Sequence, residues 1–307
     1  MTPAHAQEPA PDGVTAAEDL FVVSHFGVPR IDPRHWLLSL GGLVGRDRSF
    51  SLEDLKARPK RVVEAVHQGG GDPLKPDVPT RRVANVRWAG VDLAALLDEL
   101  EVDRRAHFLW SYGVDGGDFA GASCNWYVKD LPLERLAGGG VLLAYELNGA
   151  PLRAEHGFPV RLVVPGYYGA NSVKWLWRLH LSERRAKGPF TTTFHNGIRA
   201  IAPESIIVNP APDAVLAAGE AVEIRGWAWS SRGVASAQIS VDNGLCFTPA
   251  ALEPPRGWAW QRFSLPWLPT VRGEAHLRVR AHDAGGAGQP PDGARNAAHA
   301  VRVFIGS

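Results

Sequence analysis

Cysteine is scarce in this sequence. Its two cysteines, Cys124 and Cys246, lie far apart and match none of the short spacings that zinc sites and attached haem require. They also supply no disulfide framework and little information about the compartment. Because Cys-x-x-Cys-His is absent, any haem that works with this protein is expected on a partner.

Long apolar runs and an excess of one charge are also missing. No apolar run approaches the roughly 20 residues of a membrane span, so no membrane-spanning helix is expected. Lys and Arg number 33 and Asp and Glu 32, a net charge of +1. This balance argues against nucleic acid as the main partner, since phosphate binding needs a concentrated positive surface. The length of 307 residues, with 45% hydrophobic and 21% charged residues, favours a globular protein of about two domains.

The first residues lack the pattern of a complete secretion signal. The start of the chain is rich in Ala and Pro, and we expect a disordered tail over residues 1–19. Ala4-His5-Ala6 resembles a small-residue cleavage site, but no basic and apolar leader precedes it. Two interpretations stay open: a short tail on a cytoplasmic protein, or the remainder of an export signal on a periplasmic one.

A mixed α/β pattern follows, and we expect a domain over residues 20–190. Apolar or β-branched stretches predict strands at 36–40, 61–66, 141–145, 160–164 and 174–181. In the last of these, apolar residues alternate and are expected to share one face of the strand: Trp175, Trp177, Leu179 and Leu181. Ser51 before two acidic residues predicts a helix start. Leucines at helical spacing predict a second helix over 91–100.

The character of the sequence changes after residue 182. Residues 183–203 combine charges, threonines, Gly and Pro, and we interpret them as a connector. Short alternating stretches separated by turn residues then predict strands at 221–229, 235–241, 258–265, 275–281 and 299–305. Strands of this length and spacing are typical of a β-sandwich. We therefore expect an all-β domain over residues 200–307.

The densest motif occupies residues 144–166. It reads AYELNG at 144–149, HGFPVR at 156–161 and VPG at 164–166. Asn148-Gly149 predicts a tight turn between strands. Taken alone, Tyr145 could be a half-buried core residue. His156 and Arg161 could be surface groups, or could bind an anion together, because Arg offers a fixed fork of donors.

These motifs resemble those of the sulfite oxidase family of molybdopterin proteins. Further matches lie at 21–29, 85–91 and 169–176, and at 226–230, 241–244, 258–260 and 280–283 in the second half. The resemblance runs from about residue 20 to 305. It implies an α/β (α+β) molybdopterin domain of the sulfite oxidase type, followed by an immunoglobulin-like dimerisation domain.

The resemblance also implies roles for single residues. Tyr145 corresponds to the tyrosine beside the metal. The molybdopterin and its phosphate would be held by His25, Asp115, His156, Arg161, Ser172, Val173 and Lys174. The implied reaction is the two-electron oxidation of sulfite or a similar small anion, with the electrons passed to an external acceptor such as a cytochrome.

One position departs from the family pattern in a way that bears on the metal. The family's molybdenum-binding cysteine lies in a segment close to QCAGN, and the counterpart here is QGGGD at 68–72, with Gly69 at the cysteine position. Glycine has no ligand atom in a side chain, so metal occupancy stays open. We expect either impaired turnover of sulfite or a non-catalytic scaffold that binds the cofactor. Val23 and Asn171 also stand where the family carries basic residues.

Two side chains could replace the missing thiolate. His67 is two residues from Gly69, and in an extended chain its side chain points to the opposite face from residue 68. Cys124 is the other candidate, although a buried structural cysteine is commoner than a metal thiolate. The cofactor's dithiolene could also hold a metal without protein sulfur.

Tryptophan is abundant in the second half, at positions 227, 229, 258, 260 and 267. Aromatic residues beyond the needs of a core often serve interfaces. Together with the resemblance, this favours a homodimer through the C-terminal half. The alternative is that these side chains pack inside the sandwich.

Overall fold

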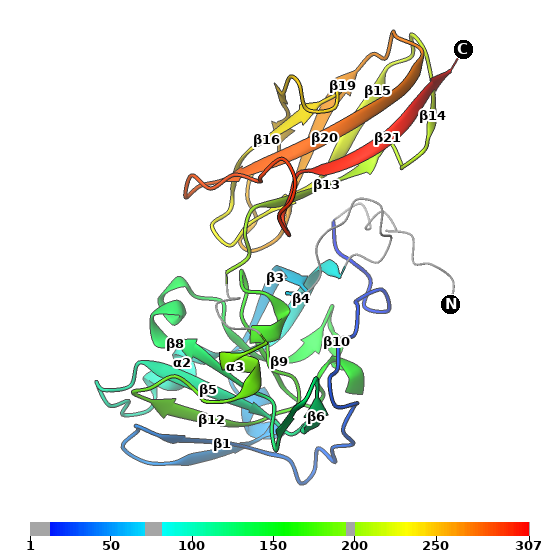
Figure 1. Cartoon of the computed structure of the whole chain (residues 1–307). Coiled ribbons are helices and arrows are strands. Elements are labelled where there is room, and N and C mark those ends of the chain that lie inside the picture. The colour runs from blue at the N-terminus through cyan, green and yellow to red at the C-terminus, as the bar shows by residue number, and fades with distance from the viewer. Residues whose placement is uncertain (1–12, 71–81, 195–199, 307) are drawn as a thin grey trace. The chain divides into compact units, whose positions relative to one another are not determined.

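The computed structural model describes residues 13–70, 82–194 and 200–306 (Figure 1). The chain divides into two compact units. Of the described residues, 15–70 and 86–194 form the N-terminal unit, and 200–306 with 13–14 and 82–85 form the C-terminal unit. Among the described residues, no helix combines the length and apolar character that a membrane crossing requires.

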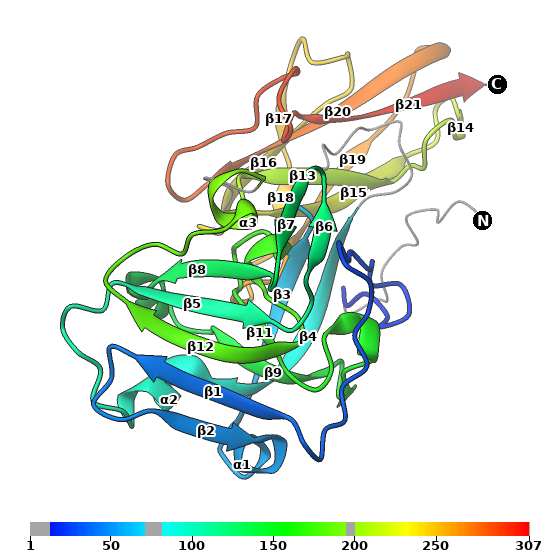
Figure 2. The same cartoon turned by 60° about the horizontal axis from the view of Figure 1, so that its bottom comes forward.

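Two sheets build the N-terminal unit. The first has the order β2-β1-β12-β5-β8 (Figure 2), with β1 and β12 parallel; the strands are β1 Leu37–Gly42, β2 Arg48–Ser51, β5 Phe108–Gly113, β8 Val128–Pro132 and β12 Leu176–Ser182. The second has the order β10-β9-β4-β3, with β11 beside β9; the strands are β3 Lys60–Gln68, β4 Val83–Asp92, β9 Leu142–Leu147, β10 Ala150–Pro151 and β11 Arg161–Val163. A hairpin joins β6 Gly117–Phe119 to β7 Ala122–Cys124.

The helices in this unit are short. They are α1 Leu52–Lys56, α2 Leu93–Asp98 and α3 Pro189–Thr192, with 3₁₀ turns η1 Leu133–Gly138, η2 Ala154–His156 and η3 Gly169–Asn171. The helix start predicted at Ser51 is confirmed: its Oγ accepts from Asp54 N at 3.1 Å, and its N–H donates to the Asp54 carboxylate at 2.8 Å. The second helix is shorter than predicted, because β4 continues to Asp92 and the Asp92 carboxylate caps α2 by accepting from Ala94 N at 3.0 Å.

The alternation predicted for 174–181 is wrong in one respect. The pairing of β12 with β5 shifts register between Leu176 and Arg178, and Trp175 precedes the strand with a φ of +51°. Leu176 therefore turns into the core with Leu179 and Leu181, whereas Trp177 is only half-buried.

The C-terminal unit is the expected all-β sandwich. One sheet has the order β13-β15-β19-β18 and the other β14-β21-β20-β16-β17. The strands are β13 Glu204–Asn209, β14 Val215–Ala217, β15 Val222–Trp229, β16 Val234–Ser240, β17 Thr248–Pro249, β18 Ala251–Leu252, β19 Gln261–Trp267, β20 Gly273–Asp283 and β21 His299–Gly306. Phe263 from the first sheet and Leu277, Val279 and Val303 from the second are fully buried between them.

The tryptophans of this unit are largely internal. Trp227, Trp229 and Trp260 are buried, and the Trp227 and Trp260 rings stack with centroids 5.0 Å apart. Their number therefore gives no evidence for an interface. The Trp260 indole donates to the Gly13 carbonyl at 2.8 Å, so residue 13, which we expected in a disordered tail over 1–19, is held in the fold. Residues 1–12 of that tail lie outside the described residues.

Candidate active site

The motif at 156–161 forms a tight loop that buries a histidine and an arginine. The 3₁₀ turn η2 ends at Gly157, whose φ of +106° reverses the chain direction, and β11 begins at Arg161. His156 and Arg161 are each 3% exposed. Their burial excludes the interpretation that they are surface polar groups.

Arg161 is buried without a carboxylate partner in the described part of the chain. Its terminal nitrogens donate to the carbonyls of His156 and Ser172 at 3.0 and 2.9 Å, and its guanidinium lies 4.7 Å from the centre of the Trp88 ring. Its Nε has no hydrogen-bond partner among the described residues. Burial lowers the pKa of Arg161 to about 9. A buried cation in this state is destabilising unless an anion compensates its charge.

Lys174 brings a second positive charge to the same place. Its Nζ donates to the Glu155 carbonyl at 2.8 Å and lies 4.0 Å from the centre of the Trp175 ring. Burial, and after it the charge of Arg161, lowers the pKa of Lys174 to about 7. Lys174 and Arg161 are thus close enough to repel each other, which is the expected arrangement of an anion site.

Ser172 and Val173 support these cations from the preceding segment. The Ser172 hydroxyl accepts from Val164 N at 3.0 Å while its carbonyl accepts from Arg161. The Val173 carbonyl accepts from Leu162 N at 2.8 Å. Both residues are buried. Their backbones therefore fix Lys174 beside β11.

Three histidines lie near the two cations, and all three have a lowered pKa. For His67 the cause is first burial and then the charges of Arg161, Lys174 and His156. For His156 burial again comes first, followed by Arg161. For His25 it is burial and then Lys174. These imidazoles are neutral near pH 7, and their ring nitrogens can donate to or accept from a ligand.

Asp115 is a carboxylate whose charge acts on Lys174. Burial raises its pKa to about 6, against the opposing charge of Lys174. Its carbonyl accepts from Tyr127 N at 2.7 Å, and the Tyr127 hydroxyl donates to the Ala170 carbonyl at 2.8 Å. Tyr127 was missed from the sequence, since no motif marks it. We call Arg161, Lys174, His156, His67 and Asp115 the charged cluster.

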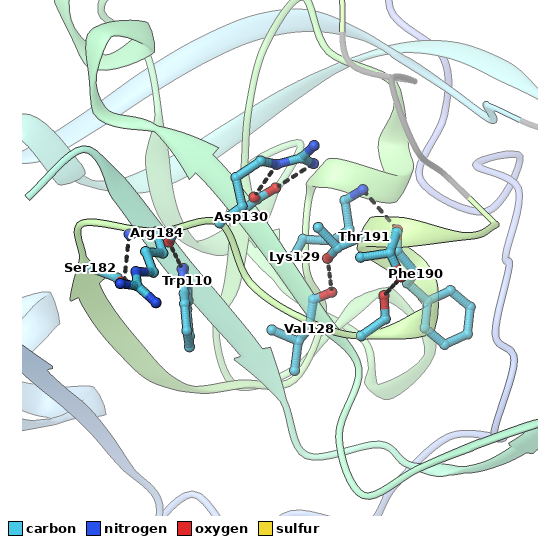
Figure 3. Close-up of polar contacts among 11 residues, drawn as sticks. Trp110, Val128, Lys129, Asp130, Ser182, Arg184, Phe190 and Thr191 are labelled. Atoms are coloured by element: carbon cyan, nitrogen blue, oxygen red, sulfur yellow. Dashed lines mark hydrogen bonds and ion pairs between the residues drawn. The ribbon is translucent and has the colours of Figure 1, made fainter.

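His25 lies near Lys174 of the charged cluster, whose charge lowers its pKa, and it packs against aromatic rings. Its ring lies 4.9 Å from Phe190, stacked at 22°, and 4.4 Å from Phe119. Phe190 belongs to α3, which two hydrogen bonds tie to β8: Lys129 Nζ donates to the Phe190 carbonyl at 3.0 Å, and Thr191 Oγ1 donates to the Val128 carbonyl at 3.1 Å (Figure 3).

The segment from residue 183 is thus more than the connector that the sequence suggested. Arg185 Nε donates to the buried Asp130 carboxylate at 2.8 Å, and the Trp110 indole donates to the Arg184 carbonyl at 2.7 Å (Figure 3). These contacts fasten residues 184–191 onto β5 and β8. They place an aromatic side chain from α3 against His25.

Tyr145 does not join the charged cluster. Arg161 pairs with Ala144 across β11 and β9, so Arg161 shares a face with Ala144 and Tyr145 points to the other face. Tyr145 is 5% exposed and packs in the hydrophobic core. Burial raises its pKa, and the charges that act on it are Glu146, Lys60 and Lys56. The position beside a metal that the resemblance implied for Tyr145 is therefore not supported by this geometry.

Gly69, the residue that the resemblance matches to the family's metal-binding cysteine, lies directly after β3. Gln68 is the last residue of that strand, and Gly69 follows it half-buried. Among the described residues, no three His, Cys, Asp or Glu side chains are grouped to bind a metal ion. Cys124 is half-buried at the end of β7, where burial and the charges of Asp115 and Asp118 raise the pKa of its thiol. This environment disfavours a thiolate.

Two family profiles match the chain. The oxidoreductase molybdopterin binding domain matches residues 25–190, and the Mo-co oxidoreductase dimerisation domain matches residues 196–303. The first match contains every member of the charged cluster and His25.

Sulfite oxidases from animals and one bacterial dehydrogenase structure are similar to most of the chain. Mouse (Mus musculus) mitochondrial sulfite oxidase is 32% identical over 88% of this chain and 56% of its own length. Chicken (Gallus gallus) sulfite oxidase is 31% identical over 90% of this chain and 68% of its own length. The chain spans 56% to 62% of the length of the mammalian relatives. The crystal structure of the sulfane dehydrogenase SoxCD from Paracoccus pantotrophus superposes with a TM-score of 0.80 at 27% identity, covering 94% of this chain and 76% of that one.

Proposed function

The chain belongs to the sulfite oxidase family of molybdopterin-binding oxidoreductases, and we propose that it binds molybdopterin and takes two electrons from sulfite or a similar small anion. The electrons would leave to an external acceptor, and Gly69 would limit turnover. The single observation that carries this proposal is the pair of neighbouring cations, buried Arg161 and half-buried Lys174, which have no ion-pair partner in the described part of the chain.

The residues present fit the anionic part of the cofactor. A phosphate monoester offers several acceptor oxygens and up to two negative charges. Arg161 Nε is buried and lacks a hydrogen-bond partner among the described residues, and Lys174 spends one donor on the Glu155 carbonyl. Charge-assisted hydrogen bonds to a phosphate would satisfy both groups. Gly69, in contrast, offers no side-chain atom to a metal.

The charged cluster would hold and orient the cofactor, which supplies the two-electron redox chemistry when bound. Arg161 and Lys174 would bind its phosphate, and His156 would offer a directed ring nitrogen beside them. Asp115, with a pKa of about 6, can hold or release a proton near neutral pH. His25 would close the other side against the aromatic wall of Phe190 and Phe119.

The partners follow from the same family membership. The match of residues 196–303 to a dimerisation domain supports a homodimer through the C-terminal unit. No Cys-x-x-Cys-His motif occurs in these 307 residues, so covalently attached haem of the kind found in c-type cytochromes would lie outside them.

A second function is favoured by Gly69 itself. A chain that binds the pterin but lacks the thiolate could serve as a cofactor-binding scaffold without turnover. The two functions differ in metal content and in response to sulfite. The scaffold would carry pterin with little molybdenum, whereas the oxidoreductase would carry both and reduce an acceptor when sulfite is added.

The test is to purify the protein from a host that makes molybdopterin and to measure three quantities. These are released pterin by fluorescence, molybdenum by mass spectrometry, and sulfite-dependent reduction of a one-electron acceptor such as ferricyanide. We expect stoichiometric pterin, molybdenum, and slow turnover. Protein that carries no pterin from such a host would overturn both functions, and pterin without metal or turnover would establish the scaffold.

A further inference from the structure

The two cations of the charged cluster come from different sheets of the N-terminal unit. Arg161 opens β11 beside β9 in the second sheet, whereas Lys174 lies two residues before β12 of the first. The chain between them contains η3 and Ser172, whose carbonyl accepts from Arg161 at 2.9 Å. The position of this connecting segment therefore determines how the two cations lie relative to each other.

Tyr127, the residue before β8, holds this segment by its side chain. Its hydroxyl donates to the carbonyl of Ala170, inside η3, at 2.8 Å. At the end of η3, Ser172 N donates to the Gly169 carbonyl at 2.9 Å, and Ser172 then presents its own carbonyl to Arg161. The Tyr127 hydroxyl is thus bonded to the turn that places the acceptor for Arg161.

The backbone of Tyr127 is bonded to the chain around Asp115. The Tyr127 carbonyl accepts from Gly113 N at 2.9 Å, and Tyr127 N donates to the Asp115 carbonyl at 2.7 Å. On the other side of this short segment, Val114 N donates to the Trp175 carbonyl at 3.0 Å. A single residue therefore connects η3 with the segment that carries Asp115.

The Tyr127 side chain is enclosed and remains a hydrogen-bond donor. It is 8% exposed, and its ring lies 6.1 Å from the His25 ring, stacked at 18°, and 4.6 Å from the Phe190 ring. Burial, and after it the charges of Asp115 and Cys124, raises the pKa of Tyr127. The hydroxyl thus stays protonated near neutral pH. Buried groups that hold the backbone of a binding segment keep the binding groups in their productive geometry.

We propose that Tyr127 is a positioning residue for the cofactor's phosphate, and that its hydrogen bond to Ala170 fixes the Ser172 carbonyl and, through it, Arg161 relative to Lys174. The two cations repel each other before an anion binds. A hydrogen bond that holds η3 in place therefore keeps the site in the geometry that the phosphate needs and reduces the cost of binding. This inference rests on the proposed function, since it requires the cofactor to bind.

The experiment compares the wild-type holoprotein with Tyr127→Phe, both made in a host that supplies the cofactor. This change keeps the ring beside His25 and removes only the hydroxyl. The readouts are the rate at which pterin leaves the folded protein, followed by fluorescence, and the phosphorus-31 magnetic resonance of the bound phosphate. We expect release to be about fivefold faster, the factor that an ordinary hydrogen bond contributes. The phosphorus resonance should move, because Arg161 is displaced.

Tyr112 provides a matched control on β5. Tyr112→Phe removes the same atom from a half-buried tyrosine whose ring lies under Arg178, and neither residue belongs to the charged cluster. This variant should keep the wild-type release rate and phosphorus resonance. A contribution to general stability alone would lower the melting temperature of the Tyr127 variant without moving the resonance.

A second pair of variants applies if Tyr127→Phe fails to fold. Replacing Tyr127 by 4-aminophenylalanine or by 4-fluorophenylalanine fills the space of the hydroxyl in both cases. The amino group can donate to the Ala170 carbonyl and should restore wild-type release and resonance. The fluorine cannot donate, so this variant should release pterin about fivefold faster.

The outcomes separate this inference from the proposed function. If wild type and Tyr127→Phe bind pterin with the same release rate and the same resonance, the role of Tyr127 is overturned and the proposed function stands. Equal changes in Tyr127→Phe and Tyr112→Phe, or faster release with an unmoved resonance, would overturn that role as well. Wild-type protein without any pterin would overturn the proposed function itself.

Discussion

Gly157 lies against Lys174 so closely that a Cβ added to Gly157 would come within 3.2 Å of the Lys174 Cβ and 3.1 Å of the Arg161 Cβ. The backbone of Gly157 has a φ of +106°, a region that L side chains rarely adopt. Arg161 and Lys174 can therefore pack on either side of Gly157 only because this residue has no side chain.

We predict that Gly157→Ala will displace this pair and reduce bound pterin. Backbone strain alone should lower the free energy of unfolding by about 1–2 kcal/mol, and the collision with Lys174 should lower it further. Gly149→Ala is the control: Gly149 has a φ of +83°, but an added Cβ would meet nothing within 4 Å. Urea denaturation and released pterin measure both effects. Equal losses in the two variants would show that packing against Lys174 is unimportant.

Arg161→Ala should yield protein with much less bound pterin. Removing one partner of a charge-assisted contact weakens binding by a few kcal/mol, or more than tenfold. The apoprotein should lose comparatively little stability, because a buried cation without a counter-charge contributes little to folding. Arg178→Ala serves as a control, since Arg178 lies over the Tyr112 ring rather than in the charged cluster. Unchanged pterin in Arg161→Ala would remove Arg161 from the site.

The stability of the apoprotein should depend on pH through Lys174. Its pKa is about 7 in the folded protein against an ordinary value of 10.5, so between these values the unfolded chain binds more protons. Stability should then rise with pH, by about 2 kcal/mol between pH 7 and pH 9 from this group alone. Urea titrations at both pH values would measure the rise. Lys174→Met should flatten it, and an equal slope in wild type and variant would contradict the assignment.

Tyr145→Phe should leave pterin content and sulfite-dependent reduction within about twofold of wild type. The register of β9 and β11 places Tyr145 on the face opposite Arg161, although the family resemblance suggested a place beside the metal. Steady-state assays of the variant decide between the two. A loss of turnover at unchanged pterin content would restore the catalytic role and contradict the geometry.

The case of Tyr145 illustrates which parts of the site the sequence could predict. The motifs identified His156, Arg161 and Lys174, and the structure brings them together. The motifs could not say which face of β9 carries Tyr145, because that depends on the register with β11. They also gave no sign of Phe190, since α3 lies in a segment whose Thr, Gly and Pro content is typical of a connector.

Dependence on tertiary contacts also explains why the sequence did not predict some strands. In β5 the buried side is formed by Leu109, Ser111 and Gly113, and the half-exposed side by Phe108, Trp110 and Tyr112. The larger apolar side chains thus lie mostly on the more exposed face, the reverse of a usual half-buried strand. The buried face carries small residues such as Gly113 because the neighbouring chain approaches it closely. A Cβ added at Gly113 would lie 2.8 Å from the Lys174 carbonyl. Such a contact cannot be inferred before the tertiary structure is known.

The remaining prediction concerns Gly69, which follows β3 and lies two residues after His67. A ligand bound directly to a metal sets the metal's geometry and redox potential, and a thiolate is a strong electron donor. We therefore expect Gly69→Cys to raise sulfite-dependent reduction of a one-electron acceptor by about tenfold or more, in protein made by a host that supplies the cofactor. Gly69→Ser is the control, since it adds a side chain of similar size without sulfur.

The gain should be incomplete, because the resemblance matches Val23 and Asn171 to positions that are basic in the family. Asn171 is buried and uncharged, and its side-chain amide donates to the Tyr168 carbonyl at 2.9 Å. It therefore cannot replace that charge. Adding Val23→Arg to Gly69→Cys should therefore raise kcat/KM for sulfite further, and this second gain should shrink at high salt because it is electrostatic. A Gly69→Cys protein with full pterin and molybdenum but no gain would show that the missing ligand does not limit the reaction. Brisk turnover by the unmodified protein would show that this chain needs no protein thiolate, and that its metal is activated by other means.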